Sequence, residues 1–277
     1  MPLEAVTWNV RSSEMDDTGD RAWSARKEGM STFINTRQPQ IVCMQECEAE
    51  QRSYLTANCA GYAAIYDNVT LSWWAALTGA ENSAEVILYK TSDITVQSSG
   101  TFWLTSGAPT SPAKSSDQQH YRSCTWMKCT YQGRKMLVMD THLSYRTKDN
   151  SALGSDDVIA LRTAEMAVIT TWLGSNYNAA TDGWLLFMGD FNTHQGEAIF
   201  DRWKDGTYGY YARDKAPGAA TGRTFNNWGN SGQLTIDHQF FKGFPSVVSY
   251  TIPKETYSSV DYLSDHWPVV AQYAMDY

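Results

Sequence analysis

Four short runs, spread over nearly the whole chain, place a carboxylate or a carboxamide directly after an apolar stretch. They are Thr7-Trp8-Asn9-Val10, Met44-Gln45-Glu46, Gly189-Asp190-Phe191-Asn192 and Ser264-Asp265-His266-Trp267. Two of the leading stretches, residues 41–44 and 184–188, are continuously apolar, as expected of buried strands. A polar side chain that follows such a strand is held rigidly at the strand's end, where a ligand can reach it. Four strand ends of this kind predict one shared site, suited to a metal ion and a phosphate.

The length and hydrophobic content fit one large domain. The chain has 277 residues, of which 42% are hydrophobic, enough for a sizeable core. The longest loop-like stretch is the Gly, Ser and Pro cluster at residues 106–116, but patterned strands lie on both sides of it. We therefore expect residues 1–277 to form a single domain with an insertion there, and the protein to be a monomer. No apolar run approaches the ~20 residues that cross a bilayer.

The charge balance bears on the partner. The net charge is −8, with only 22 Lys and Arg residues. Proteins that hold duplex nucleic acid without sequence preference present a basic face, because phosphate neutralisation supplies most of that affinity. The balance disfavours duplex DNA without excluding it, and it is compatible with a small phosphorylated substrate held by a metal and a few Arg side chains.

The five cysteines match no zinc-binding spacing. Cys47 with Cys59, or Cys124 with Cys129, allows a disulfide if the protein is exported, whereas Cys43 lies inside an apolar run and is expected in the core. The first residues lead straight into a strand, which fits either a cytoplasmic start or a chain whose leader has been removed. The abundance of Trp, Tyr, Thr, Asn and Gly with few Lys favours export, periplasmic or secreted.

Hydrophobic periodicity predicts an α/β fold. Strands are predicted at residues 3–10, 40–46, 62–66, 85–89, 94–98, 122–131, 135–142, 184–190, 235–241, 247–252 and 268–273. Helices are predicted after an N-cap at Asp20, at residues 48–58 and at residues 156–173, and Gln132-Gly133 is predicted to close a hairpin. Helices alternate with strands early in each half, while hairpins fill the rest. This order predicts two packed sheets with helices outside them and the polar strand ends along one rim.

Glu46 and Asn9 are the first candidates for chemistry. Each lies at the end of a predicted strand and offers the hard oxygen ligands that Mg²⁺ or Mn²⁺ prefers. For Glu46 alone, an acid that caps the next helix is the alternative.

Asp190 and Asn192 flank Phe191, so in extended geometry both point to one side while Phe191 packs inward. The acid can accept a proton from a water molecule, and the amide can donate to a phosphate oxygen. Gly189 permits close approach of the backbone. The alternative for this run is an Asx turn.

His266 needs an acid partner that fixes its tautomer if it acts as a base or stabilises a phosphorane. Asp237, which follows Leu-Thr-Ile, is the predicted partner, and Asp265 is left for the metal. His238 lies on the opposite face of its strand from Asp237 and is predicted to be structural.

Arg122 begins the predicted strand at residues 122–131, and His142 ends the one at residues 135–142. His142 can protonate a leaving oxygen if an acid orients it, and a satisfied structural histidine is the alternative. Arg122 has the side chain best shaped to hold a phosphate through two parallel hydrogen bonds, and a solvated surface Arg is the alternative.

Taken in order, these residues resemble the motif series of the endonuclease/exonuclease/phosphatase superfamily. The resemblance spans residues 3–273 and rests on Asn9, Glu46, His142, Asp190 with Asn192, Asp237 and Ser264-Asp265-His266. Gly-Asp-Phe-Asn and Ser-Asp-His-Trp-Pro-Val are its most specific segments. The resemblance implies a four-layer α/β sandwich, with two packed mixed β-sheets flanked by helices, and a divalent-metal-dependent phosphoric ester hydrolase.

The resemblance also implies roles around the metal and the phosphate. Glu46 would bind the metal, Mg²⁺ or Mn²⁺, with help from Asn9 and Asp265. Asp190 would orient or activate the attacking water, and Asn192 would hold the phosphate.

The remaining roles concern proton transfer and charge. His266 would work with Asp237 beside it. In members similar to secreted deoxyribonucleases, a glutamate on an earlier strand orients the acid histidine, which implies that Glu85 pairs with His142. Arg122 matches the phosphate-contacting Arg of that branch.

Departures from the family patterns bear on the substrate. Duplex-nicking members carry an Arg two residues after the metal glutamate and a Tyr two residues before the second glutamate, where this chain has Glu48 and Ser83. The Trp-Cys-Asp-Arg run of inositol polyphosphate 5-phosphatases is replaced by Thr235-Ile236-Asp237-His238. Trp73-Trp74 and the cluster at residues 208–211 are either aromatic walls around a substrate or core packing.

We therefore predict in-line hydrolysis of a phosphodiester or phosphomonoester by an activated water, with a small or lipid-derived phosphoester favoured over DNA. A nuclease acting on DNA or RNA is one alternative. A non-catalytic phosphoester-binding protein with the same fold is the other.

Overall fold

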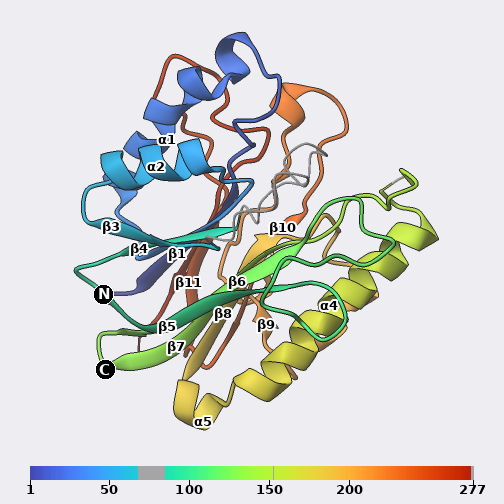
Figure 1. Cartoon of the computed structure of the whole chain (residues 1–277). Coiled ribbons are helices and arrows are strands. Elements are labelled where there is room, and N and C mark those ends of the chain that lie inside the picture. Colours follow the sequence, from blue (N-terminus) through green and yellow to red (C-terminus); the bar gives the residue numbers. More distant parts are fainter. Residues whose placement is uncertain (68–84, 152, 276–277) are drawn as a thin grey trace.

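The computed structural model describes residues 1–67, 85–151 and 153–275, in which two six-stranded mixed β-sheets pack face to face (Figure 1). The first sheet has the strand order β11 (Val247–Thr251), β12 (Val269–Tyr273), β1 (Leu3–Asn9), β2 (Ile41–Gln45), β4 (Val86–Lys90) and β3 (Tyr62–Ile65). The second has the order β5 (Ile94–Trp103), β6 (Ser123–Tyr131), β7 (Arg134–His142), β8 (Trp184–Asp190), β10 (Asp237–Lys242) and β9 (Tyr210–Tyr211). Strands β1 and β2 run parallel, as do β7 and β8, whereas the other paired strands are antiparallel.

Helices cover the outer faces of the two sheets (Figure 1). The helices α1 (Trp23–Arg37) and α2 (Ala49–Asn58) lie on the first sheet, and α4 (Asp156–Asn176) lies on the second. The shorter helices are η1 (Gly19–Arg21), α5 (Ala179–Asp182), η2 (Ala198–Trp203), α6 (Ala212–Lys215) and η3 (Asn227–Gly229). The layers of helix, sheet, sheet and helix confirm the predicted four-layer α/β sandwich. Over the described part of the chain, no helix has both the length and the apolar character needed to cross a membrane.

The side chains that meet between the sheets change from apolar to polar along the central strands. Because side chains alternate between the faces of a strand, every second residue belongs to this series. The inward series are Ala5, Thr7 and Asn9 in β1, and Val138, Asp140 and His142 in β7. Gln45 Nε2 donates to Thr7 Oγ1 at 3.1 Å and to Asp140 Oδ1 at 2.6 Å, so the first polar layer joins both sheets. Beyond that layer the strand ends form a polar rim.

Most predicted elements are present with boundaries shifted by a few residues, but two local predictions are wrong. Asp20 is not the N-cap of α1. It lies in η1, and the helix begins after Ala22, whose N–H closes the 3₁₀ turn on the carbonyl of Gly19 at 3.1 Å. Strand β5 continues to Trp103 instead of ending at residue 98, because it pairs with β6 along its whole length. A register shift between Val96 and Ser98 interrupts the alternation that the sequence pattern relies on.

The hairpin prediction at Gln132-Gly133 is confirmed. Tyr131 pairs with Arg134, and the two turn residues have φ values of 48° and 78°. Positive φ at both central positions is the geometry of a two-residue turn whose twist matches that of the flanking strands.

Neither of the two disulfides that the spacing allows is present, because all five cysteines are free and buried. Cys124 and Cys129 both lie in β6 an odd number of residues apart, so they point to opposite faces of the sheet. Cys47 and Cys59 are both in the apolar cluster between α1, α2 and the first sheet. Cys43 lies in the core between the sheets, as predicted.

Candidate active site

The carboxylate of Asp190, at the end of β8, is the point where side chains from both sheets converge. Its Oδ2 accepts a hydrogen bond from Asn9 Nδ2 at 3.1 Å. The same oxygen lies 3.4 Å from Nε2 of His142 and 3.8 Å from Nε2 of His266. Asn9 ends β1 in the first sheet, His142 ends β7 in the second, and His266 lies in the loop before β12. The structure thus brings together four segments that are far apart in the sequence.

Buried hydrogen bonds fix the loop of His266 against the end of β1. Ser264 Oγ donates to the carbonyl of Asn9 at 2.7 Å, and Trp8 Nε1 donates to the carbonyl of His266 at 3.0 Å. From helix α1, one guanidinium nitrogen of Arg26, Nη1, donates to the carbonyls of Val10 and Leu263. These contacts hold two distant loops in one geometry, as a catalytic arrangement requires.

Asp237 and His266 form the predicted pair. His266 Nδ1 lies 2.9 Å from Asp237 Oδ2 and 3.1 Å from Oδ1, and both residues are buried. Burial by itself lowers the pKa of His266, but the charges of Asp237, Asp190 and Asp265 outweigh it and raise that pKa to about 10. The ring is therefore a cation at neutral pH, with Nε2 directed toward Asp190.

Asp190 has an acidity suited to proton transfer near neutral pH. Burial raises its pKa, the neighbouring charge of Asp237 adds to the rise, and His266 opposes it, which gives a value of about 7. A carboxyl group with this pKa is partly ionised at pH 7 and can both accept and release a proton.

Glu46 and Asp265 supply a second pair of acids on the other side of the rim. Glu46 Oε1 accepts from Asn9 Nδ2 at 2.9 Å, and its Oε2 accepts from the backbone N–H of Ser12 at 3.0 Å. Burial and the charge of Glu46 raise the pKa of Asp265, and Arg11 Nη1 lies 3.5 Å from its Oδ2. The charge of Glu46 reaches Asp265, so the two carboxylates lie close together, and such a pair fits a hard divalent cation such as Mg²⁺.

Another group of potential metal-ligating atoms in the described part is formed by Asp190, Asp237 and His266, whose ligand atoms lie within 4.8 Å of one another. This buried cluster could hold a metal ion. Its members are already paired with one another, because His266 Nδ1 lies 2.9 Å from Asp237 Oδ2 and Nε2 lies 3.8 Å from Asp190 Oδ2. The predicted metal ligands Glu46 and Asp265 lie outside this cluster.

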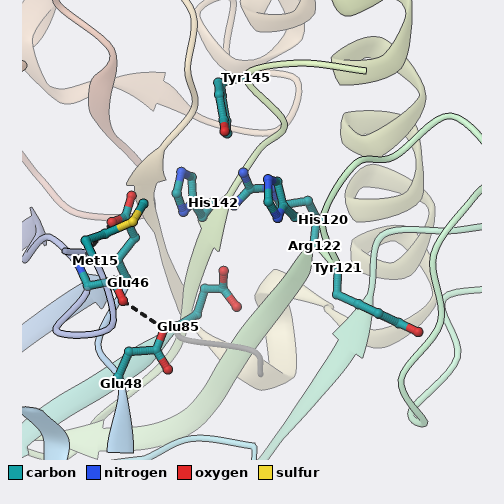
Figure 2. Close-up of a pocket in the computed structure, with 10 residues that line it drawn as sticks. Met15, Glu46, Glu48, Glu85, His120, Tyr121, Arg122, His142 and Tyr145 are labelled. Carbon is teal, nitrogen blue, oxygen red and sulfur yellow. Dashed lines mark hydrogen bonds between the residues drawn. The ribbon is translucent and has the colours of Figure 1, made fainter. Parts of the chain in front are cut away.

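His142 and Glu85 lie in the wall of a small cavity beside Asp190. This side cavity, of about 70 Å³, is lined by Glu46, Glu48, Glu85, His120, Arg122 and His142, among others (Figure 2). Burial and the charges of Arg122, His266 and His120 lower the pKa of His142 well below its usual value, so its ring is neutral before substrate binds. The Ser123 hydroxyl donates to Glu85 Oε2. Pairing of Glu85 with His142 stays a prediction.

Arg122 is buried in the same wall. Its side chain is 5% exposed, and its Nε has no hydrogen-bond partner within the described part of the chain. The guanidinium carbon lies 5.9 Å from the ring centroid of Tyr145. A buried guanidinium N–H without an acceptor is costly, so the side chain is poised to bind an anion or a hydroxyl in the cavity. A solvated surface Arg is excluded.

Asn192 both forms an Asx turn and lines the cavity, so the two interpretations of this run, an Asx turn and a phosphate donor, are compatible. Its backbone N–H donates to Asp190 Oδ1 at 2.9 Å, which is an Asx turn, and Asn192 has a φ of 50°. Its side chain nevertheless lines the cavity that contains Asp190. Nδ2 donates to the carbonyl of Leu143 at 2.9 Å, which leaves one amide proton for a phosphate oxygen.

The sequence alone did not point to several residues of this region. Arg11, Tyr145 and Arg146 line the cavity that contains Asp190, whose volume is about 440 Å³. His120 stacks on Tyr145 with ring centroids 5.9 Å apart, and burial lowers the pKa of His120 to about 4. Basic and aromatic residues are common on surface loops. Only the positions of Arg11, His120, Tyr145 and Arg146 in three dimensions therefore identify them as part of the site.

Glu165 of α4 joins the two loops that flank the side cavity. Its carboxylate accepts hydrogen bonds from the N–H of Ser144 at 2.9 Å, from Ser144 Oγ at 2.6 Å and from Gln118 Nε2 at 2.8 Å. Ser144 follows His142 by two residues, and Gln118 precedes His120 by two. Glu165 is therefore a positioning residue for both loops.

Replacing Glu165 by Ala should lower the free energy of unfolding by about 2–4 kcal/mol, because three buried donors lose their acceptor. Glu165→Gln should have a smaller effect, since it keeps one acceptor oxygen. Urea denaturation measures both. Asp157→Ala, at an exposed position of the same helix, is the control and should change the stability by less than about 1 kcal/mol. Equal stability of Glu165→Ala and the unmodified protein would contradict this role.

Gly189 confirms the predicted close approach of the backbone before Asp190. A Cβ there would lie 2.0 Å from the carbonyl oxygen of Thr141, in the neighbouring strand β7. Gly189→Ala should therefore destabilise the protein by about 3 kcal/mol, since two paired strands cannot move apart cheaply. Gly174→Ala in α4, where nothing lies within 4 Å of the added carbon, should be neutral or slightly stabilising. Chemical denaturation of both variants checks the difference.

The remaining aromatic and histidine predictions are resolved in part. His238 is structural as predicted, because its ring lies 2.8 Å from the carbonyl of Thr193 and 2.9 Å from the hydroxyl of Tyr211. Tyr211 packs in the core on the α4 side of the second sheet, so the cluster at residues 208–211 is no wall of the Asp190 cavity. Trp73-Trp74 and Ser83 lie outside the described residues.

Known proteins were compared with this chain by sequence and by structure. The family model described as "Endonuclease/Exonuclease/phosphatase family" matches residues 6–266. No curated protein matches the chain. An endonuclease/exonuclease/phosphatase family protein from Bacteroides thetaiotaomicron has a TM-score of 0.81 and 21% identity, covering 100% of this chain and 99% of that one.

Two further solved structures are similar over nearly their full length. A mannosyl-6-phosphatase from Bacteroides thetaiotaomicron has a TM-score of 0.80 and 21% identity, covering 99% of this chain and 100% of that one. TDP2 from D. rerio, in complex with a single-strand DNA product, has a TM-score of 0.69 and 17% identity, covering 99% of each chain. At these identities the likeness concerns the fold.

Proposed function

The chain belongs to the endonuclease/exonuclease/phosphatase family, whose members hydrolyse phosphoesters, and we propose that it is a divalent-metal-dependent hydrolase of a small phosphoester. The observation that carries the proposal is the convergence on Asp190 Oδ2 of Asn9, His142 and His266. The carboxylate of Asp190 can accept a proton, and two histidines lie within 4 Å of its Oδ2. His266 carries a positive charge, and His142 can donate a proton to a leaving oxygen. In-line hydrolysis of a phosphoester needs these three functions together.

Asp190 takes the proton of the attacking water. As the water oxygen bonds to phosphorus, the bond between phosphorus and the leaving oxygen breaks. His266, kept charged by Asp237, faces the negative charge of the phosphoryl oxygens. His142 gives a proton to the leaving oxygen once the bound phosphate has raised its pKa. Because His142 Nε2 lies 3.4 Å from Asp190 Oδ2, the proton taken from water can return to His142 and complete the cycle.

Glu46 and Asp265 would hold the divalent ion, Mg²⁺ or Mn²⁺. Asn9, the third predicted ligand, donates its amide Nδ2 to Glu46 and Asp190 and would help by holding these two carboxylates in place. The ion would supply positive charge that neutralises the phosphoryl oxygens. Arg122 and Asn192 would hold the phosphate from the opposite side, because each has a donor directed toward the cavities and the Nε of Arg122 lacks a partner in the described part of the chain.

The cavity and the charge of the protein favour a small or lipid-derived phosphoester over DNA. A volume of about 440 Å³ around Asp190 lies in the range of pockets for small molecules. Glu48 lines the adjoining side cavity at the position where duplex-nicking members carry an Arg, and the net charge is −8. One structural neighbour is a mannosyl-6-phosphatase and another is TDP2 with DNA, so a nuclease is the alternative that the test must separate.

A substrate screen tests the proposal. The metal-depleted protein, with Mg²⁺ or Mn²⁺ added back, is offered nitrophenyl phosphate, bis-nitrophenyl phosphate, sphingomyelin, inositol phosphates, oligonucleotides and supercoiled plasmid. We expect turnover of a small or lipid-derived ester and little nicking. Rapid plasmid nicking at physiological salt would favour the nuclease. Absence of hydrolysis of every phosphoester would favour a non-catalytic binding protein with this fold.

A further inference from the structure

We propose that Tyr145 is a further catalytic residue, whose hydroxyl donates a hydrogen bond to the leaving oxygen of the substrate beside His142. This inference rests on the proposed function and adds a group to it at the leaving oxygen. Figure 2 shows the hydroxyl of Tyr145 directed into the side cavity, toward the space between His142 and His120.

Tyr145 lies where the side cavity meets the larger cavity around Asp190. The residues that line both cavities are Met15, Glu46, His142 and Tyr145. Glu46 is a proposed metal ligand and accepts hydrogen bonds only, and the thioether of Met15 has no proton to donate. His142 is the proposed proton donor. Tyr145 therefore provides the second hydrogen-bond donor of this shared wall.

Contacts on several sides hold the ring of Tyr145 in place. The ring stacks on His120, with centroids 5.9 Å apart and planes 17° from parallel. The guanidinium carbons of Arg122 and Arg146 lie 5.9 and 5.4 Å from its centroid. The backbone directly before Tyr145 is anchored by hydrogen bonds to Glu165. A hydroxyl on a ring held in this way keeps its direction, as catalysis requires.

The hydroxyl of Tyr145 is available to a ligand. Within the described residues it makes no hydrogen bond to another group of the protein. A phenol hydroxyl that points into a polar cavity can donate its proton to an oxygen of the bound ester.

The leaving oxygen is the ester oxygen that lacks donors. The phosphoryl oxygens already have proposed donors in Arg122 and Asn192, and they face the positive charge of His266. The leaving oxygen has His142, whose ring is neutral before substrate binds, because burial and neighbouring charges lower its pKa. A second donor beside His142 would stabilise the negative charge that develops on this oxygen as its bond to phosphorus breaks.

The test compares Tyr145→Phe with the unmodified protein on n-butyl phosphate and nitrophenyl phosphate, and on the methyl diesters of both. The variant keeps the ring and removes only the hydroxyl. We expect kcat/KM for the butyl esters to fall about 10- to 100-fold, because a hydrogen bond to developing charge is lost. For the nitrophenyl esters, whose leaving oxygen is stable as an anion, the fall should be less than about 3-fold.

Tyr121→Phe is the matched control. Tyr121 also lines the side cavity, but Figure 2 shows its hydroxyl directed away from His142, and its ring packs against Trp103 with centroids 5.5 Å apart. Tyr121→Phe should leave the hydrolysis of all four esters unchanged. Because the hydroxyl of Tyr145 has no partner in the described part of the chain, Tyr145→Phe should also keep the stability of the unmodified protein in urea denaturation.

A second variant, Tyr145→Leu, removes the ring with the hydroxyl and should lose at least as much activity toward the butyl esters. Equal losses of Tyr145→Phe for butyl and nitrophenyl esters would overturn the inference, since they would indicate an effect on binding or on the phosphoryl oxygens. Unchanged hydrolysis of the butyl esters would overturn it as well. If the unmodified protein hydrolyses none of the four esters and nothing in the substrate screen, the proposed function itself fails.

Discussion

Replacing Asp190 by Asn should lower kcat for any phosphoester about 10³-fold, because the carboxylate that accepts the proton of water becomes an amide that cannot. The substitution keeps the size of the side chain, so KM should change far less than kcat. The size of the effect follows from the position of Oδ2, which Asn9 contacts directly and which His142 and His266 approach within 4 Å. Steady-state kinetics with nitrophenyl phosphate and bis-nitrophenyl phosphate measure it.

Asp182→Asn is the matched control for Asp190→Asn. Asp182 precedes strand β8 at its opposite end and pairs with Lys128 at 2.9 Å, far along the sheet from the rim. We expect the activity of the Asp182→Asn variant to stay within about twofold of that of the unmodified protein, since surface ion pairs contribute little to stability. If Asp190→Asn retained more than a tenth of the activity while folded, Asp190 would not be the base.

Replacing His142 by Ala should slow the cleavage of esters with poor leaving groups by roughly 10² to 10⁴. Alkyl oxygens need a proton as they depart, whereas a nitrophenyl oxygen is stable as an anion. The loss should therefore be large for glucose 6-phosphate or butyl phosphate and small for nitrophenyl phosphate. The measurement is kcat/KM for each ester with the variant and the unmodified protein.

His194→Ala, which removes an exposed histidine, is the control for His142→Ala and should leave both esters unaffected. Equal losses for nitrophenyl and alkyl esters would refute the role of His142 as the acid. Glu85→Gln should produce the same leaving-group dependence in weaker form if Glu85 orients His142.

Much of the site can be predicted from the sequence because the information is local. The apolar runs before Glu46 and Asp190 mark central strands, and the two-residue alternation places Asn9, His142 and Asp190 on inward faces. Parallel pairing of β1 with β2 and of β7 with β8 then brings like ends of these strands together. Which strands are neighbours is a long-range property, so the contact of Asn9 with Asp190 across the two sheets was seen only in the structure.

Residues that act from outside the strand ends are harder to predict. Glu165 stands four residues after Leu161 and four before Ile169, so an acid within the buried stripe of α4 was the available signal. Its partners Ser144 and Gln118 lie on loops, whose course no periodicity describes. The cysteines illustrate the same point: spacing allowed Cys124 to pair with Cys129, but the predicted strand that contains both places them on opposite faces.

The central claim is that Glu46 and Asp265 bind one divalent ion beside a phosphoester that residues of both sheets contact, and metal removal followed by add-back tests it most directly. Hydrolysis of the best ester from the screen is followed after treatment with EDTA and during titration with Mg²⁺, for the unmodified protein and for Glu46→Ala. We expect activity to vanish in EDTA, to return with Mg²⁺ in the unmodified protein, and to stay absent in Glu46→Ala. Undiminished hydrolysis in EDTA, or a fully active Glu46→Ala, would contradict the claim.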